Sequence, residues 1–521
     1  MKKIYIRSLF AMLLFIALVV GGCLSSSRWR EEPVNYTGPV DIFAPGAAFK
    51  IREGVDAVSG QLLVRLKPGA DPDQVFAEVD GREIQYYEGL DWYRIAFGPG
   101  FDLVSAGRRL LQTGQVYYVE PNYLVETCAK PATDSFIPPN DPGYNRQWGL
   151  EMINALAGWE KTMGSEEIII AIVDTGIDNT HPDLEDKVIK GWDFTPSGPG
   201  EFIGDDEGHG THVAGIAAAR ANNGIGIAGV APGCQLISAK VLGASGSGTW
   251  ADIAEGVFWA VDEITGYDAT GVINMSLGGR YYSRVLQEAI EYALENDIPV
   301  VAAAGNLHKY YDDYYPAAYP GVISVGAVRD DKRKAGFSAK GGHVFLAAPG
   351  QGIYSTTRGG GYDSWNGTSM ATPFVSGAVA LLKSEWPDLD INGIHAQLRK
   401  TAKDLAPAGW DPETGWGLLD LGKALEQRYE NDLFGTLEVT VVDEKEEPVP
   451  YARVFIKEIN GNRVLTAMTT DKGKALFMAQ PAGDYQIWVD GQLVGEGENS
   501  VQTVSAGEAC AVRVVLAAAG E

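Results

Sequence analysis

The chain has 521 residues, of which 42 are lysine or arginine and 68 are aspartate or glutamate, so its formal net charge is −26. This acidic balance makes nucleic acid an unfavourable partner. With 45% apolar and 21% charged residues the chain has the composition of a globular protein, and its length suggests about three domains of roughly 150 residues. Four cysteines are too few for a disulfide framework in a chain of this size.

The first residues form a targeting segment. Basic residues precede an apolar run at 9–20, which is shorter than the roughly 20 residues that cross a bilayer, so residues 1–22 are predicted to be an export signal. Small residues before Cys23 resemble the lipobox of bacterial lipoproteins, in which Cys23 would be lipidated and would hold the precursor at the membrane. The alternative is an ordinary secretory peptide with an incidental cysteine. The remaining Cys128, Cys234 and Cys510 are odd in number, so at least one should stay a thiol.

Three segments of different pattern follow the signal. Residues 23–48 are rich in Ser, Pro and Gly and read as a tether. In the segment 49–127 we expect a small α+β domain, with strands at 61–66, 92–97 and 116–119 and helices at 75–79 and 103–113. Residues 128–140 form a proline-containing linker, which is suited to cleavage because exposed loops are where proteases act.

The segments 141–427 and 428–521 predict two further folds. In the first, apolar runs separated by helical patterns such as 250–264 and 283–296 indicate βαβ units and a buried parallel sheet. Those runs lie at 168–173, 235–241, 272–275, 300–304 and 322–328. In the second, short strands between turns predict a β-sandwich. Those strands are expected at 437–442, 452–456, 475–478, 485–489 and 512–516.

Three residues of the α/β segment carry the chemistry. Asp174 ends the run IIIAIVD, and catalytic groups of open α/β sheets sit at such strand ends. His209 stands in GHGTHVAG at the start of a small-residue helix. Ser369 stands in NGTSMATP, just ahead of an apolar helix expected over 371–383, whose first amides favour developing negative charge. Together they supply a nucleophile, a base and an orienting carboxylate, although each alone also has an ordinary reading as a cap or a structural residue.

The motifs around these residues resemble those of the subtilisin family of serine endopeptidases. The chain order Asp, His, Ser matches, as do VDTGID at 173–178, HPDL at 181–184, AAAGN at 302–306 and GTSMATP at 367–373, and the nearest likeness is to thermitase-like catalytic domains. The resemblance implies that Ser369 is the nucleophile, His209 the base, Asp174 the orienting carboxylate and His212 structural. It also implies that Asn306 and the backbone N–H of Ser369 stabilise the oxyanion.

The resemblance also implies how substrate binds. Two extended segments would hold the backbone of a protein or peptide substrate, although both also read as plain glycine-rich loops. These segments are Gly246, Ser247 and Gly248 on one side and Ser276, Leu277 and Gly278 on the other. Phe374 stands where the family usually has histidine, and we expect activity to survive it. Tyr314, beside an expected cis Tyr315–Pro316 peptide, would make the primary pocket shallow.

Calcium is the cofactor that the resemblance implies. The side chains of Asp141, Asp183 and Asn223 align with the family's strong calcium site, and the carbonyls of Arg220, Ile225 and Ile227 fall on its loop. Oxygen-only ligands suit this hard cation. The plainer interpretation is that the Asn-Asn-Gly sequence is a turn and Asp183 a cap. The stretch 194–208, where the family has another calcium loop, departs from the family pattern in length and ligands.

The flanking segments resemble accessory domains. GQLLVRLKPG and VYYVEPNY, at the ends of the segment 49–127, are similar to the propeptide of fervidolysin-like proteases, which implies an intramolecular inhibitor; a generic α+β binding module is the alternative. EPVPYARVFI and TTDKGKALF resemble the transthyretin-like regulatory domain of carboxypeptidases. The sequence thus predicts an exported, calcium-stabilised serine endopeptidase, made as an autoprocessed precursor and acting at the cell surface or outside the cell. The competing interpretation is a non-catalytic surface binding protein that keeps the fold as a scaffold.

Overall fold

The computed structural model describes residues 57–87, 92–98, 102–123, 138–267, 269–306, 314–405, 407–459, 464–494 and 501–516. The expected export signal, Cys23, the tether and Cys128 lie outside the described residues. The chain divides into two compact units, Met1–Ala132 and Thr133–Glu521, and each is described by itself. Within the described ranges, no helix is long and apolar enough to cross a membrane.

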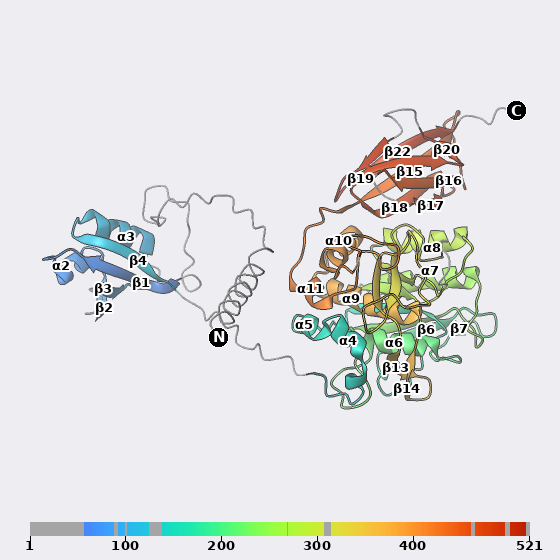
Figure 1. Cartoon of the computed structure of the whole chain (residues 1–521), viewed down its shortest axis with the longest axis horizontal. Helices are drawn as coiled ribbons and strands as arrows, with labels where there is room; N and C mark the ends of the chain where they lie inside the picture. The colour runs from blue at the N-terminus through green and yellow to red at the C-terminus, as the bar shows by residue number, and fades with distance from the viewer. Residues whose placement is uncertain are drawn as a thin grey trace, which may run out of the picture. The chain divides into compact units, whose positions relative to one another are not determined.

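The N-terminal unit is a four-stranded antiparallel sheet with two helices (Figure 1). The strand order is β2-β3-β1-β4, and helix α3 contacts β1 and β4. Leu62, Val64 and Ile95 point into a core that Leu110 of the helix closes. The elements are β1 (Ala57–Leu66), α2 (Pro72–Ala77), β2 (Arg82–Tyr87), β3 (Trp92–Ala96), α3 (Leu103–Gln112) and β4 (Val116–Tyr123). The expected strands and helices are therefore present, and β2 is a strand that the sequence reading missed.

The second unit is built on an eight-stranded sheet of order β12-β11-β10-β9-β5-β8-β6-β7, parallel except for the short edge strand β7. Every residue of β5 is buried, which agrees with its continuous apolar sequence and with helices covering both faces of the sheet. The strands are β5 (Ile168–Asp174), β6 (Val188–Asp193), β7 (Gly200–Glu201), β8 (Gln235–Lys240), β9 (Thr270–Met275), β10 (Val300–Ala303), β11 (Ile323–Val328) and β12 (Leu346–Pro349). This arrangement brings the carboxyl ends of β5, β8 and β9 together.

Two pairs of helices cover this sheet. Helices α6 and α9 pack on each other and on the central strands, and α7 and α8 form the other contacting pair. The helices are α4 (Trp148–Met152), α5 (Ala155–Trp159), α6 (His209–Ala218), α7 (Trp250–Gly266), α8 (Arg284–Glu295), α9 (Thr368–Glu385), α10 (Ile391–Thr401) and α11 (Leu421–Glu426). A short helix, η1 (Tyr144–Arg146), precedes α4, and a hairpin of β13 (Ile353–Thr357) and β14 (Gly361–Trp365) precedes α9.

The predicted start of α9 was wrong. The helix begins at Thr368 rather than Ala371, so Ser369 lies inside the first turn instead of ahead of it. Gly367 precedes the helix in an extended conformation, and Thr372 Oγ1 donates to the Thr368 carbonyl, which continues the helical turn. The first-turn amides of α9 are accordingly those of the segment that contains Ser369.

The C-terminal part of this unit is made of two small sheets that share one hydrophobic core. One sheet has the order β18-β15-β22, and the other β17-β16-β19-β20 with β21 also paired to β19. Alternate residues such as Leu437, Val439 and Val441 of β15 face Val454 and Ile487 in this core. The strands are β15 (Phe434–Asp443), β16 (Arg453–Glu458), β17 (Val464–Met468), β18 (Lys474–Pro481), β19 (Gly483–Val489), β20 (Gln492–Leu493), β21 (Val501–Val504) and β22 (Ala509–Leu516).

Candidate active site

Asp174 and His209 meet where β5 ends and α6 begins. Asp174 is fully buried, and its carboxylate Oδ1 lies 2.8 Å from His209 Nδ1. A Cβ atom at Gly210 would lie 2.1 Å from the carbonyl oxygen of Gly176, so only glycine lets the first turn of α6 approach the turn after β5 this closely. The Gly-His-Gly sequence therefore sets the distance between the imidazole and the carboxylate.

The charges around His209 favour its protonated form. Burial alone lowers the pKa of the imidazole, but the Asp174 charge and its hydrogen bond outweigh burial, and Glu207 and Asp205 act in the same direction. The net effect is a pKa raised above the ordinary value of about 6.5. A ring that binds its proton more tightly than usual is a stronger base.

An acidic loop before His209 holds the start of α6, and the sequence reading gave it no role. The Asp205 carboxylate accepts the backbone N–H groups of Gly208 and Thr211, at 2.8 and 3.0 Å. Glu207 Oε2 accepts the His209 N–H at 2.7 Å. These acids cap helix donors that would otherwise be unsatisfied and put negative charge at the positive end of the helix. The signal in the sequence was a run of three consecutive acidic residues, Asp205, Asp206 and Glu207, directly before Gly208.

Lys240 is a second residue that the sequence reading missed. Its side chain is 1% exposed, and its ammonium group donates to the carbonyls of Thr175 and Leu242 at 2.9 and 2.7 Å. It also forms an ion pair with Asp206 at 2.7 Å. The buried lysine thereby ties the turn after Asp174 to the segment that leads into the cleft.

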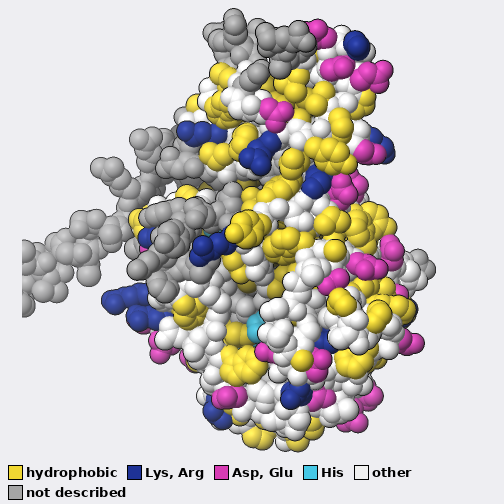
Figure 2. Space-filling model, turned by 90° about the vertical axis from the view of Figure 1, so that its right-hand side faces the viewer, with side chains coloured by type: hydrophobic (Ala, Val, Ile, Leu, Met, Phe, Trp, Pro, Cys, Tyr) yellow, Lys and Arg dark blue, Asp and Glu magenta, His cyan; other side chains and the backbone are white. Residues whose placement is uncertain are grey.

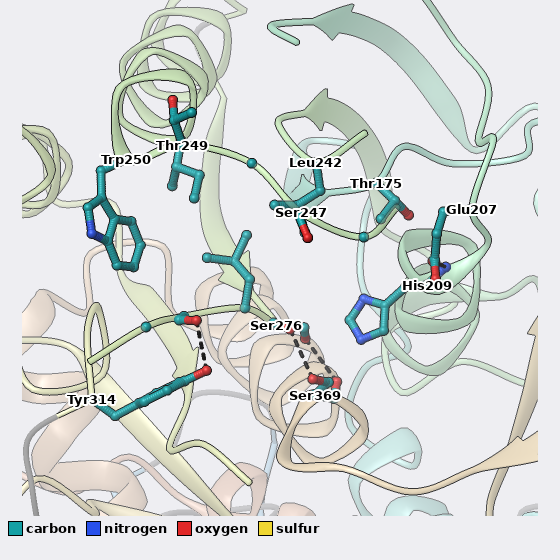
Figure 3. Close-up of a pocket in the computed structure, with 16 residues that line it drawn as sticks. Thr175, Glu207, His209, Leu242, Ser247, Thr249, Trp250, Ser276, Tyr314 and Ser369 are labelled. Carbon is teal, nitrogen blue, oxygen red and sulfur yellow. Dashed lines mark hydrogen bonds between the residues drawn. The ribbon is translucent and has the colours of Figure 1, made fainter. Parts of the chain in front are cut away.

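Ser369 lines the same cleft as His209, and Figure 3 shows its side chain on the side of the imidazole that faces the cleft. Its Oγ donates to the carbonyl of Ser276 at 2.9 Å, while Ser276 Oγ donates to the Ser369 carbonyl at the same distance. Among the described hydrogen bonds, none joins Ser369 Oγ to His209. The imidazole points into the space that Ser369 borders, with Nδ1 taken by Asp174, so Nε2 is the ring nitrogen free to receive a proton from the serine.

Asn306 follows β10 and is fixed by the residue before the serine. Its Oδ1 accepts the backbone N–H of Thr368 at 2.9 Å and the Thr368 hydroxyl at 3.0 Å. The hydroxyl in turn accepts the N–H of Gly305 at 3.2 Å. With its oxygen held in this way, the amide leaves its Nδ2 donors for another partner.

The predicted substrate segments all line one cleft of about 600 Å³ together with Ser369 and His209. They are Gly246, Ser247, Gly248, Ser276, Leu277 and Gly278. Tyr314 lies across one end of the cleft, with its hydroxyl donating to the Gly278 carbonyl at 2.8 Å (Figure 3). The Tyr315–Pro316 peptide is cis, which confirms that expectation. The tyrosine ring fills space at this end and shortens the pocket.

The surroundings of His212 and Phe374 bear on the expectations for these two residues. His212 is buried and stacks on Trp365 with ring centroids 4.4 Å apart, and burial lowers its pKa to about 4. That surrounding agrees with a neutral, structural histidine. Phe374 is buried against α4, where a Cβ at Gly149 would lie 2.5 Å from its ring. Trp365, at the end of β14, was not singled out from the sequence.

The expected calcium ligands Asp141, Asp183 and Asn223 converge away from the cleft. Both carboxylates are buried; Asp141 accepts the N–H of Asn223 at 3.1 Å, and Asp183 accepts the Ile227 N–H at 2.8 Å. Burial and the nearby Asp183 charge raise the pKa of Asp141 against its backbone hydrogen bonds. Two buried carboxylates that repel each other suit a cation between them.

The loop that carries the remaining expected ligands lies against Asp183. The Arg220 N–H donates to the Asp183 carbonyl at 3.0 Å, and Ile225 and Ile227 continue the same loop. A Cβ at Gly226 would lie 1.9 Å from Asp183 Oδ2, so the cradle requires glycine. The Asn223 amide faces Asp183 with its nitrogen and would turn its oxygen inward for a metal. In the described ranges no three His, Cys, Asp or Glu side chains cluster as a metal site, so a cation here would also need backbone and amide oxygens.

Two of the cysteines can be placed. Cys234 is buried in the α/β core and Cys510 is half-buried in β22, and both are free thiols. The expectation that at least one cysteine stays reduced is therefore confirmed. Burial raises the pKa of the Cys234 thiol to about 11, which makes it unreactive at neutral pH.

Comparison with known proteins shows which family has this fold and these motifs. Residues 165–417 match the model of the subtilase family, and residues 43–122 match that of the fervidolysin N-terminal prodomain. Fervidolysin from Fervidobacterium pennivorans is 34% identical over 500 residues, covering 85% of this chain and 69% of that protein. Thermitase from Thermoactinomyces vulgaris is 43% identical over 272 residues, covering 52% of this chain and 94% of thermitase.

A solved structure agrees with these sequence matches. The crystal structure of fervidolysin, described as a keratinolytic enzyme related to subtilisin, superposes with a TM-score of 0.63 and 30% identity. The superposition covers 90% of this chain and 79% of that one. The chain belongs to the subtilase family of serine endopeptidases and carries a prodomain of the fervidolysin type.

Proposed function

We propose that this protease uses Ser369 as nucleophile, His209 as base, Asp174 as the carboxylate that orients it, and Asn306 with the Ser369 N–H as oxyanion donors. The observation that carries the proposal is the 2.8 Å contact of His209 Nδ1 with the buried Asp174, which leaves Nε2 facing the cleft that Ser369 lines. Asp174 holds the ring in one tautomer and stabilises the imidazolium that forms when the serine proton is transferred.

The proposed reaction begins with a change of partner at the serine. Ser369 Oγ donates to the Ser276 carbonyl, and a substrate N–H that binds this carbonyl would release the hydroxyl toward His209 Nε2. Oγ then attacks the scissile carbonyl while its proton passes to Nε2. Asn306 Nδ2 and the Ser369 N–H donate to the oxygen as it becomes negative, and the imidazolium returns its proton to the leaving amine. Water hydrolyses the acyl-enzyme by the same route.

Labelling with a fluorophosphonate tests the nucleophile. We expect one adduct per chain, on Ser369 in the peptide map, and no adduct in the Ser369→Ala variant. Ser364→Ala, at an exposed position of β14, is the matched control and should label normally. An adduct that persists in Ser369→Ala would refute the assignment. Absence of any adduct in folded wild-type enzyme would favour the non-catalytic surface binding protein.

Calcium is proposed as a stabilising ligand. Asp141, Asp183 and Asn223 would hold it with carbonyls of the loop that contains Arg220, Ile225 and Ile227, and a bound divalent cation would neutralise the two buried carboxylates. These residues join the start of the catalytic part to the loop after α6 and lie apart from the cleft. Its expected contribution is therefore to resistance against unfolding rather than to the peptide-bond chemistry.

Export and processing complete the proposal. The segment 1–22 would direct secretion, and lipidation of Cys23 would hold the precursor at the membrane until cleavage within 128–140 separates the prodomain from the enzyme. The prodomain, as an intramolecular inhibitor, would keep the precursor inactive until then. Mass spectrometry of the exported precursor tests the anchor, since an unmodified Cys23 would refute it. The mature enzyme would act outside the cell or at its surface on proteins, among which keratin is a substrate to test.

The C-terminal β-sandwich, residues 428–521, is proposed to be of the transthyretin-like, carboxypeptidase-regulatory kind. The two-sheet arrangement with alternating inward residues supports this assignment. None of its described residues lines the cleft that holds Ser369. The sandwich therefore does not take part directly in hydrolysis.

A further inference from the structure

The backbone of Met468 forms one of the contacts by which the β-sandwich docks on the protease. Met468 ends β17, the edge strand of its sheet. Its N–H donates to Tyr282 Oη and to Gln287 Oε1, both at 3.1 Å. Its carbonyl accepts Arg284 Nη1 at 2.6 Å and Gln287 Nε2 at 3.1 Å. The free edge of the sandwich is thus satisfied by side chains at the start of α8, which protects it from pairing with another strand.

On the protease side of this contact, Gln287 is enclosed by the sandwich and is 1% exposed. Its amide oxygen accepts the Met468 N–H, and its amide nitrogen donates to the Met468 carbonyl and to Glu291 Oε1. Figure 2 shows hydrophobic side chains on the outer surface beside the junction of the sandwich and the α/β part.

A second contact fixes the sandwich independently of Met468. Phe434, at the start of β15, is fully buried in the core of the protease, with Phe345 and His395 at centroid distances of 6.2 and 5.9 Å. Asn392 of α10 accepts the N–H of Ala479 at 3.0 Å. Two separated anchors prevent the sandwich from swinging, so Met468 is held at a fixed place relative to α8.

Tyr282, whose hydroxyl accepts the Met468 N–H, is connected to the substrate cleft through Tyr315. The Tyr282 ring packs edge-on against Tyr315, with centroids 5.4 Å apart at 85°. Tyr315 pairs through both backbone groups with Gly279, at 2.8 and 2.9 Å, and Gly279 lines the cleft. Tyr314, the residue before Tyr315, closes the end of the pocket.

The pocket wall has little room to adjust by itself. A Cβ at Gly278 would lie 2.5 Å from the Tyr314 ring, and one at Gly305 would lie 3.0 Å from it. The ring is held between two backbone segments, so its position follows that of the Gly278–Gly279 segment and of Tyr315. A shift of Tyr282 would be passed on through Tyr315 to this wall.

We propose that the β-sandwich is a positioning element of the primary pocket, in which Met468 fixes Tyr282 and Tyr282 fixes the wall formed by Tyr314, Tyr315 and Gly279. Tyr282 is a positioning residue, because it acts on substrate through its neighbours. The inference rests on the proposed serine endopeptidase function. It assigns the sandwich a part in substrate selection, beyond adhesion or stabilisation.

Two variants of the full chain test the proposal from opposite sides of the contact. Tyr282→Phe keeps the ring and removes the hydroxyl that Met468 uses. Met468→Pro removes the N–H from the sandwich side, at an edge position where proline is tolerated. Tyr292→Phe on the same helix is the control, since its hydroxyl bonds to the exposed Asp262 at 2.9 Å, away from the sandwich.

Each variant is titrated with the fluorophosphonate, so that rates refer to active enzyme, and is assayed on two peptides that differ only in Phe or Ala before the cut. We expect kcat/KM for the Phe peptide to fall by about threefold or more through KM in both variants, while the Ala peptide and the Tyr292→Phe control change little. An equal loss for both peptides, or no loss in labelled enzyme, would overturn the proposal and leave the protease function intact. If the fluorophosphonate did not label Ser369 in the wild-type enzyme, the proposed serine endopeptidase function would be refuted instead.

Discussion

Glu291 of α8 should make the stability of this protease fall as the pH rises toward neutrality. Its carboxyl is 13% exposed, accepts Gln287 Nε2 at 2.5 Å and lies 3.4 Å from Arg284 Nη2. Burial raises the pKa to about 7 although Arg284 and Gln287 oppose it, and Glu295 and Glu288 add to the rise. The protonated carboxyl is therefore the form that the folded protein prefers.

The sign and size of the effect follow from this pKa. The folded protein binds the proton more tightly than the unfolded chain, so the stabilisation is complete below the unfolded value of 4.5 and is lost as the pH rises to about 7. At about 1.4 kcal/mol for each pKa unit, the free energy of unfolding should fall by up to about 3 kcal/mol over this range. Glu291→Gln has no proton to lose and should lack this part of the pH dependence.

Calorimetry in the inactive Ser369→Ala background measures the effect without self-digestion. We expect the melting temperature of the parent, relative to Glu291→Gln, to drop by several degrees between pH 4.5 and pH values above 7. Glu288→Gln is the matched control, because its side chain is 44% exposed and also pairs with Arg284. Parallel pH profiles for the parent and Glu291→Gln would show that Glu291 is ionised throughout and would refute the reasoning.

The remaining predictions concern maturation, catalysis and calcium. The Ser369→Ala variant should accumulate a precursor that retains residues 49–140, because prodomain removal needs the same nucleophile; normal processing of the purified variant would refute self-cleavage. The acid limb of kcat/KM should lie above about pH 6.5, since the pKa of His209 is raised. Glu207→Gln should move that limb to lower pH while keeping the helix cap, and the exposed Glu201→Gln should not. Chelation of calcium should lower the inactivation temperature with little change in the initial rate, because a cation at a hundredfold excess over Kd stabilises the folded protein by about 2.7 kcal/mol. Asp183→Ala should mimic chelation. An immediate loss of the initial rate on chelation would place the metal in the mechanism.

Sequence patterns predicted the buried strands better than the half-exposed ones. The run ending at Asp174 is apolar throughout, and the strand is buried along its length. Strand β6, by contrast, is mostly half-buried, and its mixed sequence VIKGWD lacks a clear period. The hairpin of β13 and β14 was also missed, although β13 is mostly buried, and with it Trp365, which stacks on His212. The short buried strand β12 was missed as well.

The start of α9 shows a second limit. Gly367, Thr368 and Ser369 have weak helix propensity, and Pro373 falls inside the helix, so local preference places its first residue too late. Tertiary bonds decide the matter instead, since Asn306 Oδ1 accepts the Thr368 N–H from outside the helix. That bond joins the end of one strand to the start of a distant helix, and no local pattern encodes it.

The contacts of Met468 are also tertiary hydrogen bonds that no local sequence pattern encodes. Tyr282 and Gln287 read as ordinary residues of an amphipathic helix start, and Met468 as an ordinary strand residue. Their importance comes from two backbone groups on a sheet edge, which every strand possesses and which therefore leave no trace in residue type. A sequence can show which residues carry the chemistry because that chemistry needs particular side chains. The support of the cleft by a neighbouring domain uses backbone groups and ring contacts, so it emerges only when the two parts are seen packed together.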